Sequence, residues 1–281
     1  MQFSIRPVGV TLIVTLAAFA SPSPSLAADG YVRASVGMAT ATAGGTLQTE
    51  STLTNDALVQ ETSEFSLGAG AVAEIAAGFT VTRGLALELG LGYTYGQAAS
   101  SHSMLAISSG NGSNSTNTTT HDRAGTLIRA TPAVVLSAEL ARTTIYARFG
   151  PTIASATATD RKLSSTATSI DATTVVLHGG LALGWCAAVG ASVQIADRID
   201  IYGELGLTSL AYKPQFGSLT ESTSNGVDKL PGMTTRKKEV EFKDKVTTLS
   251  GEANDGLPDQ AVASRLPFST IAGAVGVRMR F

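Results

Sequence analysis

Apolar residues alternate with small or polar residues along several stretches of this chain. In the C-terminal stretch, Ile271, Val277 and Phe281 fall on one face of an extended backbone, and Arg278 and Arg280 fall on the other. A strand separates such residues because successive side chains point to opposite faces, whereas a helix would place charge all round. The pattern therefore predicts a β-strand with one apolar and one polar face.

The same period of two recurs in seven earlier segments. The clearest begins after Gly84, where leucine or tyrosine occupies every odd position from Leu85 to Tyr95. The least regular runs from Leu127 to Ser137, because Pro132 and Val135 interrupt its pattern. The predicted strands cover residues 31–40, 65–81, 84–96, 127–137, 144–150, 175–195, 199–208 and 270–281.

The connections between these segments are of two kinds. Three are tight turns, at residues 82–83, 139–142 and 197–198, and four are long polar stretches, at residues 42–63, 99–123, 158–173 and 214–268. Short turns alternating with long loops are typical of bacterial outer-membrane barrels, in which the short ends are periplasmic and the long loops extracellular. We therefore expect an all-β, membrane-spanning antiparallel up-and-down barrel of about eight strands. Residues 238–244 also alternate, so a projecting hairpin or a ten-stranded barrel is the alternative.

Charge distinguishes this barrel from a soluble one. A soluble up-and-down barrel turns its apolar face inward around a ligand. Here every charge in the predicted strands falls on the face that carries glycine, alanine, serine and threonine, which suits a narrow polar lumen, and the leucine-rich face suits lipid. The predicted lumen charges are Arg33, Glu74, Glu88, Arg129, Arg148, Glu204, Arg278 and Arg280.

Two readings of these lumen charges are open. Rings of charged side chains line the pathways of ion channels, so the barrel could be a narrow porin-like channel. An eight-stranded barrel is only wide enough for its interior to be filled by side chains, so opposite charges inside it are expected to pair. We favour a lumen plugged by a Glu/Arg network.

The N-terminal segment has the features of a secretory signal peptide. A basic start ending at Arg6 is followed by an uncharged run from Val8 to Ala20, two prolines and small residues before Ala27. The run is shorter than the roughly 20 residues of a spanning helix. We expect cleavage after Ala27, or after Ala28, which leaves residues 28–281 as the barrel.

Composition excludes several classes of function. The formal net charge is -2 and only 15% of residues are charged, so no basic surface for nucleic acid is expected. Cys186 is the single cysteine, and no spacing suggests a metal or cofactor. Envelope enzymes need a histidine beside a nucleophile and an acid. His178, expected near the outer end of its strand, is the best of three histidines, but no local spacing supports a catalytic site, so we do not expect an enzyme.

Taken together, the leader, the motif from Gly30 to Gly37, the repeated Gly-x-Gly strands and the ending Val277–Phe281 resemble the small outer-membrane β-barrel family of OmpA, OmpX and the neisserial opacity proteins. The resemblance implies that Phe281 is the signal read by the barrel-assembly machinery and that the protein lies in the outer membrane of a Gram-negative-type bacterium. We expect no peptidoglycan-binding domain after the last strand. We expect a surface-exposed structural barrel whose loops bind host or cell-surface ligands; the channel is the alternative, and a lipid- or peptide-modifying enzyme is the third possibility.

Overall fold

The computed structural model describes residues 30–42, 46–54, 57–64, 66–108, 114–166, 168–246 and 255–281. This part of the chain is almost entirely β-strand, and none of its helices is long and apolar enough to cross a membrane. The elements are β1 (Gly30–Ala41), β2 (Thr46–Thr54), β3 (Ala57–Glu64), β4 (Gly70–Thr82), β5 (Leu85–Gly96), β6 (Ala99–Ser108), β7 (Asn114–Leu140), β8 (Thr143–Ser165), β9 (Ile170–His178), β10 (Ala182–Ala196), β11 (Ile199–Tyr212), β12 (Phe216–Ser224), β13 (Val227–Asp228), η1 (Leu230–Gly232), α1 (Thr235–Lys238), β14 (Glu239–Lys243), β15 (Asp259–Val262), β16 (Leu266–Pro267) and β17 (Thr270–Arg280).

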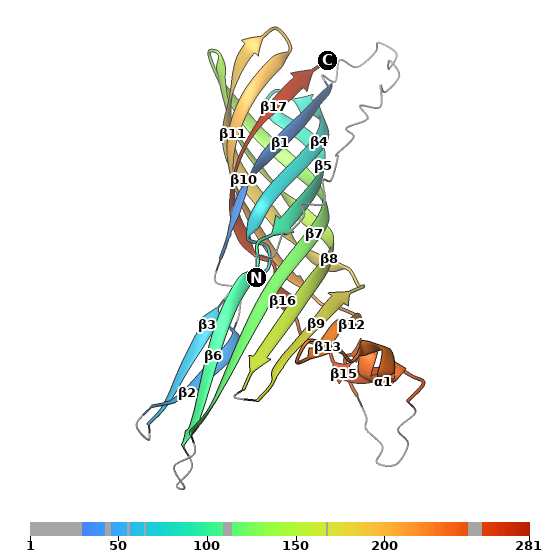
Figure 1. Ribbon diagram of the computed structural model, residues 1–281. Helices are drawn as coiled ribbons and strands as arrows, with labels where there is room; N and C mark the ends of the chain where they lie inside the picture. Colours follow the sequence, from blue (N-terminus) through green and yellow to red (C-terminus); the bar gives the residue numbers. More distant parts are fainter. Residues whose placement is uncertain are drawn as a thin grey trace.

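Eight of these strands close into a barrel. The ring runs β1, β4, β5, β7, β8, β10, β11, β17 and back to β1, with every neighbouring pair antiparallel (Figure 1). The three tight turns lie between β4 and β5, β7 and β8, and β10 and β11, at the end of the barrel that we call the short-turn end. The membrane-spanning, up-and-down barrel predicted from the sequence is confirmed, with eight strands rather than ten.

The register of the strands fixes the width of the barrel. A row of paired residues that starts at Ile128 on β7 returns to β7 at Ala138, a stagger of ten residues. With eight strands, this stagger corresponds to a strand tilt of about 40° and to an interior just wide enough to be filled by side chains. The row passes through Tyr93, Ala73, Val36, Val275, Gly203, Ala191 and Ile145.

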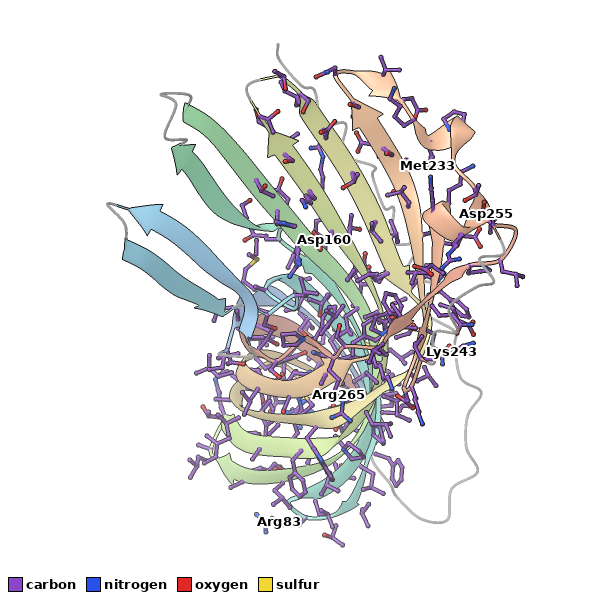
Figure 2. All side chains as sticks on the ribbon, turned by 90° about the horizontal axis from the view of Figure 1, so that it is seen from below. Arg83, Asp160, Met233, Lys243, Asp255 and Arg265 are labelled. Carbon is purple, nitrogen blue, oxygen red and sulfur yellow. The ribbon has the colours of Figure 1, made fainter. Side chains whose placement is uncertain are left out.

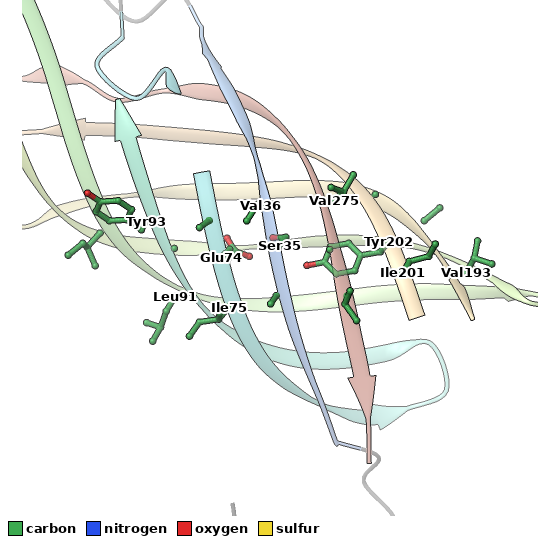
Figure 3. A pocket seen from close by; sticks show the side chains of 18 residues that line it. Ser35, Val36, Glu74, Ile75, Leu91, Tyr93, Val193, Ile201, Tyr202 and Val275 are labelled. Atoms are coloured by element: carbon green, nitrogen blue, oxygen red, sulfur yellow. The ribbon is translucent and has the colours of Figure 1, made fainter. Parts of the chain in front are cut away.

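The two faces of the ring strands differ as the sequence predicts. On β5, Leu87, Leu89 and Leu91 are exposed on the outer wall, whereas Glu88 between them is 6% exposed and points into the lumen. Figure 3 shows residues of both faces on neighbouring strands, among them Val36 and Ile75 of the outer wall and Glu74 and Tyr202 of the interior. The exposed apolar wall is the surface that such a barrel offers to lipid.

Pro132 lies inside a ring strand, and the barrel compensates for it. The ladder between β7 and β8 lacks residue pairs at positions 131–133, because proline has no N–H to donate. On the lumen side, the Thr152 hydroxyl lies 2.9 Å from that of Thr131 and 3.3 Å from the carbonyl oxygen of Ala130, to which it donates. The gap in the ladder is thereby bridged by buried hydroxyl groups.

Two of the ring strands, β7 and β8, continue beyond the barrel and form part of a projecting sheet. β7 has 27 residues and β8 has 23, more than twice the 9 to 11 that a transmembrane strand needs. Their outer halves pair with β6 and β9, and β12, β14 and β15 extend the sheet on the β9 side. The 12 residues of β7 from 114 to 125 extend roughly 40 Å along the strand, so the projecting sheet is a substantial body outside the ring (Figures 1 and 2).

Three sequence predictions differ from this structure. Residues 175–195 form two strands rather than one, because Gly179 and Gly180 adopt φ angles of 82° and 81° and turn the chain between β9 and β10. The strand predicted over residues 65–81 begins only at Gly70, and Leu67 is buried in a turn before it. The described parts of the long connections over residues 42–63, 99–123 and 158–173 are largely strands rather than irregular loops, and residues 214–268 contain the strands β12 to β16. Their serine- and threonine-rich sequences have two polar faces, so they lack the alternation by which the ring strands are recognised. β14, within residues 238–244, joins the projecting sheet and not the ring.

Candidate functional site in the barrel lumen

Six of the eight predicted lumen charges meet in one cluster. Three glutamates and three arginines contributed by six different ring strands lie at the centre of the barrel, and all six are at most 9% exposed. Their formal charges cancel. We call this the central network: Arg33, Glu74, Glu88, Arg129, Arg148 and Glu204.

Arg33 connects one half of the central network. Its Nε and Nη2 donate to the two carboxylate oxygens of Glu88, both at 2.8 Å, which is a bidentate pair. Nη2 also donates to Glu74 Oε1 at 2.5 Å. Nη1 donates to the Tyr202 hydroxyl at 3.0 Å. Bidentate Arg–carboxylate pairs fix geometry as well as charge, so Arg33 holds β1, β4, β5 and β11 in one arrangement.

Arg148 and Arg129 connect the other half. Arg148 donates through Nε and Nη2 to Glu204 at 2.9 and 2.7 Å, and its Nη2 lies 2.9 Å from Glu74 Oε1. Arg129 donates from Nη2 to Glu74 Oε2 at 2.9 Å and from Nη1 to Thr208 at 3.2 Å. Glu74 therefore accepts hydrogen bonds from Arg33 and Arg129 and forms an ion pair with Arg148.

Tyrosine hydroxyls complete the central network, a contribution that sequence reasoning missed. Tyr31 donates to Glu88 Oε2 at 3.0 Å and Tyr146 donates to Glu204 Oε2 at 3.2 Å, while Tyr202 accepts from Arg33. All three tyrosines occupy lumen-facing positions of the alternating pattern. Their lumen-facing positions could have predicted their role, because a buried tyrosine needs a hydrogen-bond partner for its hydroxyl.

Arg278 and Arg280 do not join the central network. Nearer the short-turn end, Arg278 lies 2.7 Å from Asp200 Oδ2 and Arg280 lies 2.7 Å from Asp200 Oδ1. Arg278 also donates to Ser192 at 3.0 Å. Asp200 is 1% exposed and shares the lumen-facing parity of Glu204, so the pattern could have identified it. A cavity of about 20 Å³, room for a single water molecule, is lined by residues of both clusters.

The opposite end of the lumen is closed by apolar side chains, which we call the apolar cap: Leu67, Leu127, Leu210, Tyr212, Leu266 and Phe268. Residues 66–68 and 266–269 fold across the barrel mouth and are tied together, since the Leu67 N–H donates to the Pro267 carbonyl at 2.9 Å. The Phe268 N–H donates to the carbonyl of Leu210 on β11, also at 2.9 Å. Phe268 is 1% exposed and packs edge-on against Tyr212, with ring centroids 6.0 Å apart.

The histidines whose side chains are described lie in the projecting sheet. His121 Nδ1 is 3.4 Å from Asp160 Oδ1, and Arg123 donates to the other oxygen of Asp160 at 2.9 Å. His178 lies at the end of β9, 3.5 Å from the Ser218 hydroxyl. Among the residues that the structure describes, no acidic side chain forms a hydrogen bond or ion pair with His178. Within the described ranges, no three His, Cys, Asp or Glu side chains are grouped to hold a metal ion.

Several predictions concern residues that the structure does not place or does not test. The signal peptide and its cleavage at Ala27 lie outside the described residues, as do Phe65 and the side chain of His102. Phe281 is described, and its N–H donates to the Gly30 carbonyl at 2.9 Å, which joins the two ends of the barrel sequence. Its role as an assembly signal remains a prediction.

No known protein family and no curated protein sequence matches this chain. Among solved structures, the chain is similar to the crystal structure of Neisserial surface protein A (NspA). The two are 9% identical, with a TM-score of 0.37, and the match covers 90% of this chain and 97% of that one. The barrel architecture described above rests on the strand pairing of this chain and not on that likeness.

Proposed function

We propose that this chain is an outer-membrane protein of a Gram-negative-type bacterium. In this proposal the barrel is a non-conducting anchor and the projecting sheet faces the cell exterior, where it mediates adhesion or binds a partner. The observation that carries the proposal is the continuity of β7 and β8, which pass from the lipid-facing wall into a sheet that lies wholly beyond it.

The packing of the lumen supports an anchor rather than a channel. The central network is neutral and buried, and the apolar cap fills the end of the lumen from which the sheet projects. A conducting path would have to cross both layers. Arginines and glutamates that pair with one another hold the strands together instead of lining an open pathway.

The outer face of the projecting sheet supports a role in partner binding. A row of polar side chains crosses four strands, with Asp122 on β7, Arg161 on β8, Thr174 on β9 and Glu221 on β12. Thr174 donates to Glu221 at 2.8 Å, and Arg161 lies 4.0 Å from the same carboxylate. Polar groups presented on a rigid, hydrogen-bonded scaffold can recognise a partner with little loss of conformational entropy.

Surface labelling tests the orientation. Cysteine is introduced at exposed Asp228 in the projecting part, or at exposed Thr82 at the short-turn end, in a chain carrying Cys186→Ala. Intact cells treated with a membrane-impermeant maleimide are expected to label Asp228→Cys and not Thr82→Cys, and both should label in lysed cells. Labelling of Thr82→Cys on intact cells would show that the short-turn end, and not the projecting sheet, faces the cell exterior.

Cell adhesion tests the role of the sheet. Residues 161–174 are replaced by Asn-Gly, which closes β8 and β9 with a two-residue turn directly after the Asp160–Val175 pair. Expressing cells are then compared for attachment to an epithelial cell layer and to one another. We expect the shortened chain to lose attachment while keeping the heat-modifiable gel shift of a folded barrel. Unchanged attachment by a displayed, shortened chain would contradict the proposal.

A further inference from the structure

At the short-turn end of the barrel, an arginine lies in each of the three tight turns and at the end of β17. Arg83 lies between β4 and β5, Arg142 between β7 and β8, Arg198 between β10 and β11, and Arg280 ends β17 beside β1. Figure 2 shows Arg83 at the end of the barrel remote from Asp160 of the projecting sheet. Four arginines are thus distributed around the whole rim.

Backbone hydrogen bonds hold this rim in a fixed shape. The Ser137 N–H donates to the Gly84 carbonyl at 2.8 Å, and the Gln194 N–H donates to the Arg142 carbonyl at 3.1 Å. The Arg280 N–H donates to the Arg198 carbonyl at 2.8 Å. The turn arginines therefore project from ordered backbone rather than from loose loops.

Three of the four arginines have no ionic partner among the described residues. Arg280 pairs with Asp200, whereas Arg83, Arg142 and Arg198 are exposed and form no ion pair there. The acids of the turns, Glu139 and Asp197, are also exposed and are fewer. The three arginines, which we call the rim arginines, are available to an external anion.

Depth along the strands indicates which anion the rim arginines meet. Val81, Leu140 and Ile195 are the last lipid-facing apolar residues before the turns, with 49%, 59% and 60% exposure. The arginines follow two or three residues later, within the two-residue turns, roughly 3 to 5 Å beyond the apolar wall at the rise and tilt of these strands. This depth falls within the headgroup layer on each side of the bilayer core, which is about 5 to 8 Å thick.

The other end of the wall provides an internal comparison. There the lipid-facing residues Met38, Ile153 and Leu207 are followed two positions later by Thr40, Ser155 and Ser209. These residues are uncharged. Arginine at headgroup depth is therefore found at the short-turn end and not at these positions of the other end, so the end of the apolar wall does not by itself account for it.

We propose that the rim arginines bind the phosphates of anionic phospholipids in the leaflet that surrounds the short-turn end. Guanidinium groups match phosphate oxygens bidentately, and an arginine near an anionic membrane surface is attracted to it electrostatically. This inference rests on the membrane-spanning barrel but not on surface display or adhesion, so it can fail or hold independently of them.

Lipid selectivity measured by electron paramagnetic resonance tests the proposal. The full chain is folded into phosphatidylcholine bilayers that contain a trace of spin-labelled phosphatidylglycerol or phosphatidylcholine, and the motionally restricted fraction of each label is measured. The test variant carries Arg83→Gln, Arg142→Gln and Arg198→Gln. The matched control carries Arg161→Gln, Arg236→Gln and Arg265→Gln, which removes the same charge from residues beyond the other end of the wall.

Wild type and control are expected to restrict phosphatidylglycerol several-fold more strongly than phosphatidylcholine, and the test variant to restrict both equally. Raised sodium chloride should weaken the preference. A preference that survives in the test variant, or falls equally in the control, would overturn the proposal. A further outcome would also overturn it: if the preference for phosphatidylglycerol disappears when inorganic phosphate replaces chloride at equal ionic strength, the rim arginines bind free phosphate rather than the lipid. If the test variant does not fold, the single substitutions are compared, and three unchanged preferences would count against the proposal.

Discussion

At the scale of single residues, the lumen shows how a barrel tolerates buried charge. Each carboxylate of the central network accepts from arginine, and Glu74 accepts from Arg33 and Arg129 and forms an ion pair with Arg148. Removing one partner of a buried pair leaves the other charge uncompensated, which is costly even where the intact pair contributes little net stability. The network therefore specifies a single arrangement of strands more than it adds to the free energy of unfolding.

Glu204→Gln tests this view. Arg148 would lose its bidentate partner and keep only its ion pair with Glu74 and a longer one, at 3.7 Å, with Glu88, so we expect the free energy of unfolding to fall by about 3 to 5 kcal/mol. Urea titration in lipid vesicles measures it. The control combines Glu204→Leu with Arg148→Met, which removes both charges and leaves Glu74 with Arg33 and Arg129. A double variant less stable than the single one would show that the pair itself is strongly stabilising.

Leu89→Arg tests the outer wall. Leu89 is 54% exposed and pairs with Ala77 and Pro132 halfway along its strand, so arginine there would lie near the middle of the bilayer. We expect destabilisation of about 2 to 4 kcal/mol in vesicles. Gln260→Arg adds the same charge in the projecting sheet and should change stability by less than about 0.5 kcal/mol. Equal effects of the two would mean that Leu89 does not contact lipid.

At the scale of elements, the ring strands could be predicted from sequence, whereas most of the projecting strands could not; β14, within the alternating residues 238–244, is the exception. Lipid outside and a narrow lumen inside force apolar and small or polar residues to alternate, and that alternation is visible along β5 and β17. The outer halves of β7 and β8 meet water on both faces, so no such constraint shapes their sequence. Those strands form through backbone hydrogen bonds to neighbouring strands, and such bonds do not require a particular pattern of side chains.

Deleting Phe281 addresses the last ring strand. Phe281 is exposed on the outer wall, and its backbone closes the seam between β17 and β1. If the terminal aromatic residue is read during assembly, its deletion should reduce the amount of folded barrel in outer-membrane fractions, with Phe281→Tyr close to wild type. Equal amounts of folded barrel for the wild type, the deletion and Phe281→Tyr would show that Phe281 has no role in assembly.

At the scale of the whole molecule, the central network was predicted in outline and the apolar cap was not. The alternating pattern placed Arg33 and Glu204 on one face, but strand order and stagger decide which charges meet, and these depend on closure of the ring. Phe268 lies in a predicted connection, whereas Leu67 lies inside the strand predicted over residues 65–81 but before the start of β4, and both residues belong to segments that fold back across the mouth. Nothing local in the sequence indicates that return.

Single-channel recording tests the closed lumen. The refolded chain, shown to be folded by its heat-modifiable gel shift, is expected to give no steady openings in a planar bilayer, since the central network and the apolar cap lie in series. Stepwise openings abolished by substitution of Arg148 or Glu88 would instead identify a channel lined by those residues.

The unbroken course of β7 and β8 has a mechanical consequence. A pull on the tip of the projecting sheet acts along the strands, at right angles to the hydrogen bonds of their antiparallel ladder. The bonds then share the load in shear instead of opening one after another, as they would if the strands were peeled apart. The force passes directly into the barrel wall without crossing a hinge, so the barrel and the projecting sheet resist tension as one piece.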